Sequence, residues 1–131
     1  MKTIKISTKK DNEVIDITSI VDLEVKGITD GLVSIFSLHT TAALTTADLD
    51  PGTDQDMMDA FKEMVPKLAY RHPHNPEHTP DHILSALIGA SISIPIKDGK
   101  LYLGSWQRLV LVELDGPRER ELVVQVQSFD K

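Results

Sequence analysis

The chain has 131 residues, a formal net charge of −6 and no cysteine, and 40% of its residues are hydrophobic. This length is expected to form a single domain, and the absence of cysteine excludes disulfides, thiolate nucleophiles and cysteine-based zinc sites. The negative charge and an aromatic content of 5% argue against a nucleic-acid partner.

The sequence predicts neither a membrane span nor a secretory signal. No apolar run approaches the ~18 residues that a spanning helix needs. Lysines interrupt the first apolar residues, Ile4 and Ile6, so no signal-peptide core is present there. A soluble, cytoplasmic protein without a membrane partner is therefore expected.

The N-terminal third is predicted to be mostly β-structure. Its predicted strands are residues 2–7, 14–17, 32–38 and 43–46. The first two are expected to pair as a hairpin. The third is continuous and β-branched, which predicts a central strand buried on both faces. Between them, Thr18 or Ser19 is expected to cap a short helix that Gly27 ends.

Two longer helices are predicted in the middle of the chain. The segment from Thr53 to Val65 has apolar residues at helical spacing, and Pro66 ends it. Its expected buried stripe is Met57, Phe61, Met64, Val65 and Leu68, which we interpret as core filling. Further on, Thr79 as the cap and Pro80 as the first helical residue predict a second helix, which Gly89 ends.

The last third is predicted to be a β meander. Its predicted strands are residues 92–96, 101–103, 109–114 and 122–126, with turns at Asp98-Gly99 and at Asp115-Gly116-Pro117. Pro95 has no amide hydrogen to donate, so its strand is expected at an edge or a bulge. The layout predicts one α+β domain over residues 1–131, with a mixed or antiparallel sheet and two or three helices.

All five histidines fall in one third of the chain, at His39, His72, His74, His78 and His82. Neutral imidazole is the commonest metal ligand, and it titrates near neutrality. His82 is expected in a first helical turn, where the helix dipole disfavours imidazolium. His39 follows a predicted strand, a reasonable place for a ligand or for proton transfer. His74 and His78 are interpreted as solvated loop residues, and a purely structural role for His82 remains open.

Several other polar or aromatic residues are candidates for the same site. Thr40 and Thr41 could bind a phosphate oxygen or simply make turn hydrogen bonds. Asp48 could supply an oxygen ligand to a divalent ion. Trp106 could stack on a heteroaromatic ring, and Gln107 could form hydrogen bonds to the edge of that ring. Alternatively, Trp106 could fill the core or lie in a subunit contact.

The run Arg118-Glu119-Arg120 after a proline turn suits either an anion or, more commonly, a surface salt-bridge cluster. No phosphate-binding loop, nucleophile elbow or dinucleotide fingerprint is present. The residues alone therefore favour a histidine-rich site without defining its reaction.

Taken together, these segments resemble the YjbQ family, which is described as secondary thiamine-phosphate synthases. The matching segments are residues 39–43, 65–66, 70–72, 82, 87–89, 98–99, 103–107 and 115–118. Their order and spacing are specific, and they cover nearly the whole chain. The resemblance implies an α+β fold and a homotrimer. It also implies a weak ability to join hydroxymethylpyrimidine diphosphate and thiazole phosphate to thiamine phosphate, releasing pyrophosphate.

His39, His72, His82, Trp106 and Gln107 match positions of the family. Together with the residue types discussed above, this gives the expected site. The expected catalytic residues are His39, His82 and Gln107; the substrate-binding residues are Thr40, Thr41, Arg71 and Trp106; and the ligands of a Mg or Zn ion are His39, His72, His82 and Asp48. Asp48 stands where the family has Glu, Ser105 replaces Thr, and residues 79–81 replace small residues. Two other functions stay open: a non-catalytic metal- or phosphate-binding oligomeric module, and a metal-dependent hydrolase.

Overall fold

The computed structural model describes all 131 residues and confirms the α+β class. The strands are β1 (Lys2–Ser7), β2 (Glu13–Asp16), β3 (Asp30–Ser37), β4 (Ala42–Ala47), β5 (Ser91–Lys97), β6 (Lys100–Leu101), β7 (Arg108–Glu113) and β8 (Glu119–Ser128). The helices are α1 (Thr18–Asp22), α2 (Thr53–Met64) and α3 (Thr79–Ile88), with 3₁₀ turns η1 (Leu23–Val25) and η2 (Pro76–His78). None of the helices is long and apolar enough to cross a membrane.

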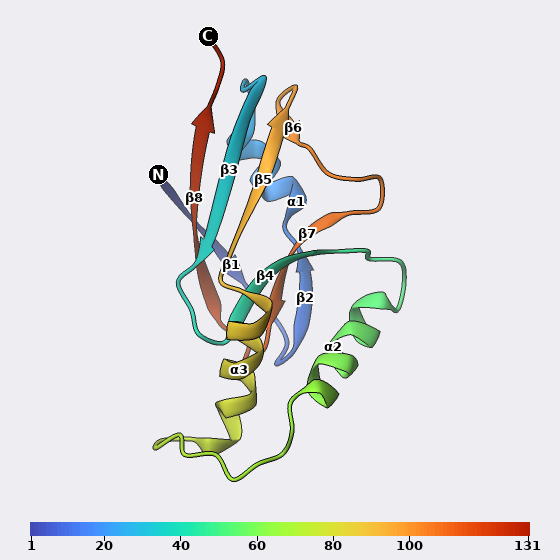
Figure 1. Ribbon diagram of the computed structural model, residues 1–131, viewed down its shortest axis with the longest axis vertical. Helices are drawn as coiled ribbons and strands as arrows, with labels where there is room; N and C mark the ends of the chain where they lie inside the picture. Colours follow the sequence, from blue (N-terminus) through green and yellow to red (C-terminus); the bar gives the residue numbers. More distant parts are fainter.

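The strands form two antiparallel sheets, with the orders β1-β8-β3-β5-β6 and β2-β7-β4. Helices α2 and α3 lie together toward one end of the molecule, and β3, β5 and β8 extend toward the other (Figure 1). The larger core cluster joins the two sheets, because Val33 and Ile35 of β3 pack with Leu109 and Leu111 of β7.

The second sheet is covered on its other face by the helices. Val110 and Val112 of β7 belong to a second core cluster with Met58 of α2 and Leu84 of α3. The domain therefore has three layers, in which the small sheet is the middle one. Strand β7, and not β3, is the strand buried on both faces.

The prediction that residues 32–38 are buried on both faces is wrong. In β3 the burial alternates: Val33 and Ile35 are buried, whereas Phe36 is 48% exposed and Leu38, just beyond the strand, is 51% exposed. The reason is that no layer of this chain covers the outer face of the five-stranded sheet. The β-branched run at β7 is just as continuous, so composition could not show which of the two would be central.

Two predicted pairings are also wrong. Strand β1 pairs with β8, and β2 pairs with β7, so the first two strands do not form a hairpin. Strand β7 belongs to the second sheet, so the last four strands are not a simple meander. The Asp98-Gly99 hairpin between β5 and β6 is confirmed. Strand β5 lies between β3 and β6, so it is not the edge strand that Pro95 suggested. Strand β6 ends at Leu101, opposite Ile96, and beyond it the carbonyl of Pro95 still accepts a hydrogen bond from the amide of Tyr102. The missing amide hydrogen of Pro95 points to the same side, so the ladder with β3 loses no bond.

The helix boundaries are shifted by about one residue from those expected. The N-cap of α2 is Gly52, not Thr53, and the N-cap of α3 is His78, not Thr79. Met58 is the buried residue of α2, whereas Met64 and Leu68 of the predicted stripe are 61% and 65% exposed. The helix ends at Met64, but Val65 directly after it is buried in the same core cluster as Met58, and Phe61 packs against that cluster. Part of the predicted stripe is therefore core.

Candidate functional site

A polar cleft of about 730 Å³ lies where the loop after β3, the turn after β7 and the start of α3 meet. Only one of its twelve lining residues is hydrophobic. They are Leu38, His39, Thr40, Thr41, His72, Asn75, His78, His82, Asp115, Arg118, Glu119 and Arg120. Such a lining suits a polar or charged molecule better than an apolar one.

His39 is held by the backbone of β8. Its Nε2 atom accepts a hydrogen bond of 2.7 Å from the amide of Glu121. Burial lowers the pKa of His39, and the positive charge of Arg120 lowers it further. The ring is therefore neutral near pH 7, and with Nε2 accepting, its proton lies on Nδ1. His39 can thus donate a hydrogen bond to an anion in the cleft.

His72 and His82 also line the cleft. Their rings stack with centroids 5.2 Å apart and an interplanar angle of 22°. The Nδ1 atom of His72 accepts a hydrogen bond of 3.2 Å from the amide of Asn75, which holds the loop before α3. His82 is the fourth residue of α3, so the helix positions its side chain directly.

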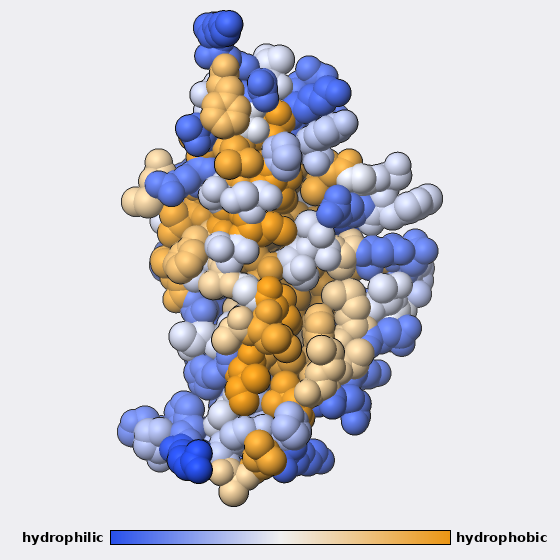
Figure 2. Space-filling view, in the orientation of Figure 1, coloured by the Kyte–Doolittle hydropathy of each residue, from blue (hydrophilic) through white to orange (hydrophobic).

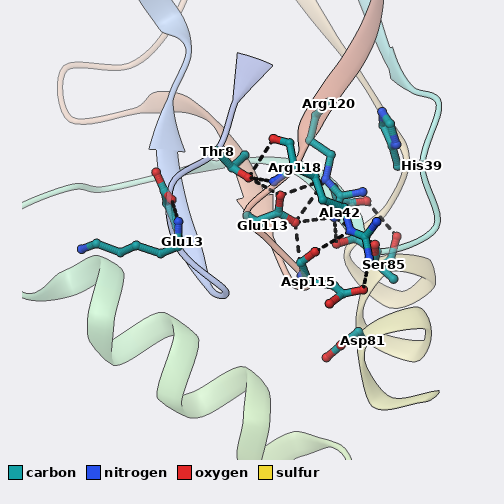
Figure 3. A network of polar contacts seen from close by, with 12 residues as sticks. Thr8, Glu13, His39, Ala42, Asp81, Ser85, Glu113, Asp115, Arg118 and Arg120 are labelled. Carbon is teal, nitrogen blue, oxygen red and sulfur yellow. Dashed lines mark hydrogen bonds and ion pairs between the residues drawn. The ribbon is translucent and has the colours of Figure 1, made fainter. Parts of the chain in front are cut away.

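A buried ion pair supports one wall of the cleft (Figure 3). Arg120 is 2% exposed and Glu113 is fully buried, and the two side chains share three hydrogen bonds. Arg120 Nη2 also donates to the carbonyl and the hydroxyl of Thr41, at 3.0 and 2.9 Å. Thr8 donates to Glu113 at 2.7 Å. The pair therefore fixes the position of Thr41 in the cleft.

The charge state of Glu113 follows from these contacts. Burial by itself raises the pKa of Glu113, but the hydrogen bonds from Arg120 and Thr8 outweigh it, so the pKa lies below its ordinary value. The carboxylate is thus ionised at neutral pH and balances the buried guanidinium.

Sequence reasoning placed Arg120 more readily in a surface cluster than in the interior. The structure buries Arg120, whereas the side chain of Arg118 is 55% exposed and pairs with Asp115 at 3.1 Å. One signal was available in the sequence. Arg120, Leu122 and Val124 alternate along β8, so they share the face that enters the core.

The structure brings together most, but not all, of the predicted site residues. His39, Thr40, Thr41, His72 and His82 all line the cleft. Asp48, Trp106 and Gln107 line a separate shallow cavity of about 350 Å³, and Arg71 is exposed and lines neither. Within one chain, the predicted site is therefore divided between two places.

The loop that carries Trp106 is organised by Gln107. The Gln107 side chain accepts a hydrogen bond from the amide of Gly104 at 3.0 Å and donates one to Thr46 at 2.9 Å. Trp106 is 75% exposed, which rules out a role in the core of its own chain. Gln107 holds this loop in place and does not reach the cleft.

The predicted metal ligands do not fit an ion within one chain. Asp48 lies in the other cavity, and the Nε2 lone pair of His39 is taken by the amide of Glu121. A different cluster has the spacing of metal ligands, namely His78, Asp81 and Asp115. His78 is therefore not the free loop residue that its proline-rich surroundings suggest.

Comparison with known proteins identifies the class to which this fold and cleft belong. The sequence matches the family described as UPF0047 protein YjbQ-like over residues 2–129. It is 37% identical over 129 residues to the UPF0047 protein YugU of Bacillus subtilis, covering 96% of this chain and 98% of that protein. A UPF0047 protein of Archaeoglobus fulgidus is 36% identical over 122 residues, covering 92% and 96% of the two chains.

Solved structures give the same result. A YbjQ-like protein of unknown function from Sulfolobus solfataricus superposes with a TM-score of 0.87 at 35% identity, over 95% of this chain and 94% of that one. A YjbQ/UPF0047 protein from Clostridium acetobutylicum has a TM-score of 0.87 at 34% identity, over 97% and 100%. The chain belongs to the YjbQ/UPF0047 family.

Proposed function

We propose that the protein is a secondary thiamine-phosphate synthase that uses the cleft between the loop after β3 and α3. The observation that supports this most is the lining: four histidines, two arginines and two threonines surround a cavity with a single apolar residue. In the proposed step, the thiazole nitrogen attacks the methylene carbon of hydroxymethylpyrimidine diphosphate. A carbon–nitrogen bond forms, the carbon–oxygen bond breaks, and pyrophosphate leaves with the electron pair.

The residues of the cleft would act on the leaving group. Donors placed where charge develops lower the barrier of such a step. The proposed donors to the phosphate oxygens are the Nδ1 hydrogen of His39 and the hydroxyl of Thr40. Arg118 would balance the negative charge of the leaving pyrophosphate. Arg120 is a positioning residue, because it acts through Thr41. A cytoplasmic location fits this proposal, because phosphorylated intermediates do not diffuse across membranes.

An activity assay tests the proposal. Wild-type protein, given the magnesium complex of the pyrimidine diphosphate and the thiazole phosphate, should form thiamine phosphate slowly, detected as fluorescent thiochrome. His82→Ala should lower the rate about 100-fold, as expected for loss of a hydrogen-bond donor to the leaving pyrophosphate. His74→Ala is the matched control from the same segment, and its exposed ring should leave the rate within about twofold.

Two outcomes would count against the synthase. Equal rates in both variants and wild type would assign the signal to a contaminant. No product from wild type would favour a binding module without turnover.

We also propose that the chain works as a homotrimer. The outer face of the five-stranded sheet is not covered by any element of this chain, and Phe36 is exposed there. Apolar residues form a band over β3 and β5 down to α3 (Figure 2). Small domains gain depth for a pocket from a neighbouring subunit. The exposed Trp106 is suited to reach the cleft of such a neighbour and stack on the pyrimidine.

Light scattering tests the assembly. Wild type should have three times the chain mass of 14.5 kDa, and Phe36→Glu should give monomers because it buries a charge in the interface. Leu68→Glu, which changes an apolar residue that is 65% exposed and lies away from this sheet, should remain trimeric. A monomeric wild type at micromolar concentration would contradict the proposal.

A further inference from the structure

Three side chains at the edge of the cleft converge although they come from two distant parts of the chain. His78 caps α3 and Asp81 lies in its first turn, while Asp115 follows β7. The Nδ1 atom of His78 lies 3.3 Å from Asp81 Oδ2 and 3.2 Å from Asp115 Oδ1. All three ligand atoms lie within 4.8 Å of one another. Figure 3 shows Asp81 beside Asp115 at the margin of the buried network.

The Nδ1 atom of His78 has no hydrogen-bond partner in the protein. This atom is buried from solvent and makes no hydrogen bond of acceptable geometry, despite the two nearby carboxylates. A buried nitrogen without a partner is costly, and it normally indicates a missing ligand or water. The carboxylates are also largely screened from solvent, at 24% exposure for Asp81 and 14% for Asp115.

The charges in the cluster favour a bound cation. Burial raises the pKa of Asp81, and the negative charge of Asp115 raises it further, with His78 opposing this rise. Arg118 binds the second oxygen of Asp115, Oδ2, at 3.1 Å, and this leaves Oδ1 directed to His78. Holding one carboxylate oxygen so that the other is presented is a common feature around metal sites.

We propose that His78, Asp81 and Asp115 form a zinc-type binding site at the edge of the cleft. In a tetrahedral site with metal–ligand distances of about 2.0–2.1 Å, neighbouring ligand atoms lie about 3.3 Å apart. The two nitrogen–oxygen separations at His78 match that spacing. Imidazole nitrogen with carboxylate oxygens suits zinc, whereas magnesium and calcium prefer oxygen ligands throughout.

The site has three protein ligands, so a fourth position is left for water or a substrate oxygen, as in zinc sites that are open to ligands. His78 and Asp115 both line the cleft, so that position is accessible to a molecule bound there. Two carboxylates and a neutral imidazole would balance the charge of the ion. This inference does not rest on the reaction proposed above, because zinc binding is measured without either substrate.

Calorimetric titration of the metal-free full-length protein with zinc chloride tests the site. Wild type should bind one zinc ion per chain, and Asp81→Asn and His78→Asn should each weaken binding at least about 100-fold. Asparagine is a favoured N-cap residue, so His78→Asn should keep α3 folded, which circular dichroism checks. With cobalt in place of zinc, wild type should show the intense visible absorption of a tetrahedral ion, and both variants should lose it.

Matched controls separate this site from other histidines and acids. His74→Asn and Asp56→Asn change exposed residues of the same types and should leave affinity and stoichiometry unchanged. Loss of zinc binding in His72→Ala, with binding retained in Asp81→Asn, would overturn the proposal and place the ion at the stacked histidines. Absence of stoichiometric zinc binding by wild type would also overturn it.

Discussion

Glu113→Leu is expected to lower the free energy of unfolding by about 3–5 kcal/mol, because it leaves the guanidinium of Arg120 buried without a counter-charge. Glu113 is fully buried and Arg120 is 2% exposed, so solvent cannot replace the lost carboxylate. Urea denaturation followed by circular dichroism measures the loss. The same variant should weaken ligand binding in the cleft, because Arg120 no longer holds Thr41 in one position.

Two comparisons isolate the buried charge as the cause. The double variant Glu113→Leu with Arg120→Met removes both charges, so it should be more stable than Glu113→Leu alone. Asp16→Asn breaks an ion pair with Arg108 that is also short, at 2.7 Å, but its side chains are 35% and 40% exposed. Asp16→Asn should lower the free energy of unfolding by no more than about 1 kcal/mol. Equal losses in Glu113→Leu and Asp16→Asn would contradict the explanation.

The buried pair also predicts how stability depends on pH. The pKa of Glu113 is lower in the folded protein than in the unfolded chain, so the ionised carboxylate stabilises the fold at pH values above the unfolded pKa. This contribution should disappear as the pH falls below about 4.3 and through the folded pKa. Acid titrations of wild type and Glu113→Leu should show a steeper loss of stability for wild type.

Gly116→Ala is expected to destabilise the protein by about 3 kcal/mol, at the upper end of the range for overpacking. A Cβ atom at Gly116 would lie 2.2 Å from the backbone oxygen of Lys10 and 2.9 Å from the hydroxyl of Thr8. The Lys10 oxygen is backbone, so it cannot move aside as a flexible side chain would. Thermal or urea unfolding measures the change.

Gly104→Ala is the matched control for that substitution. A Cβ atom there would meet only the side chain of Gln107, at 3.6 and 3.8 Å, which is ordinary van der Waals contact. Its unfolding free energy should stay within about 0.5 kcal/mol of wild type. If Gly116→Ala lowers the free energy of unfolding as little as Gly104→Ala does, the close approach between the turn after β7 and the loop after β1 does not constrain the fold.

Local signals in the sequence were sufficient for most of the elements. Alternating apolar residues located β1, and the Asp98-Gly99 pair located the hairpin between β5 and β6. The proline after Val65 marked the end of α2. These features depend on backbone conformation and on neighbours within a few residues, which the sequence specifies directly.

The layers were decided by long-range packing. The continuous apolar runs at β3 and β7 are alike in composition, yet only β7 has a layer on each side. Which strand becomes central depends on which other strands and helices cover it, and no local pattern contains that information. The same applies to β1, whose partner β8 lies at the far end of the chain.

For the candidate site too, the sequence determined some features and only the tertiary structure determined the others. The clustering of the histidines in one third of the chain, together with the resemblance to the YjbQ family, indicated His39, His72 and His82, and the fold places all three around one cleft. The buried pair of Arg120 with Glu113 and the approach of Asp115 to His78 join segments that are far apart along the chain. Charged residues have no periodic signal that reveals their partners, since burial and pairing arise only when the sheets and α3 pack together.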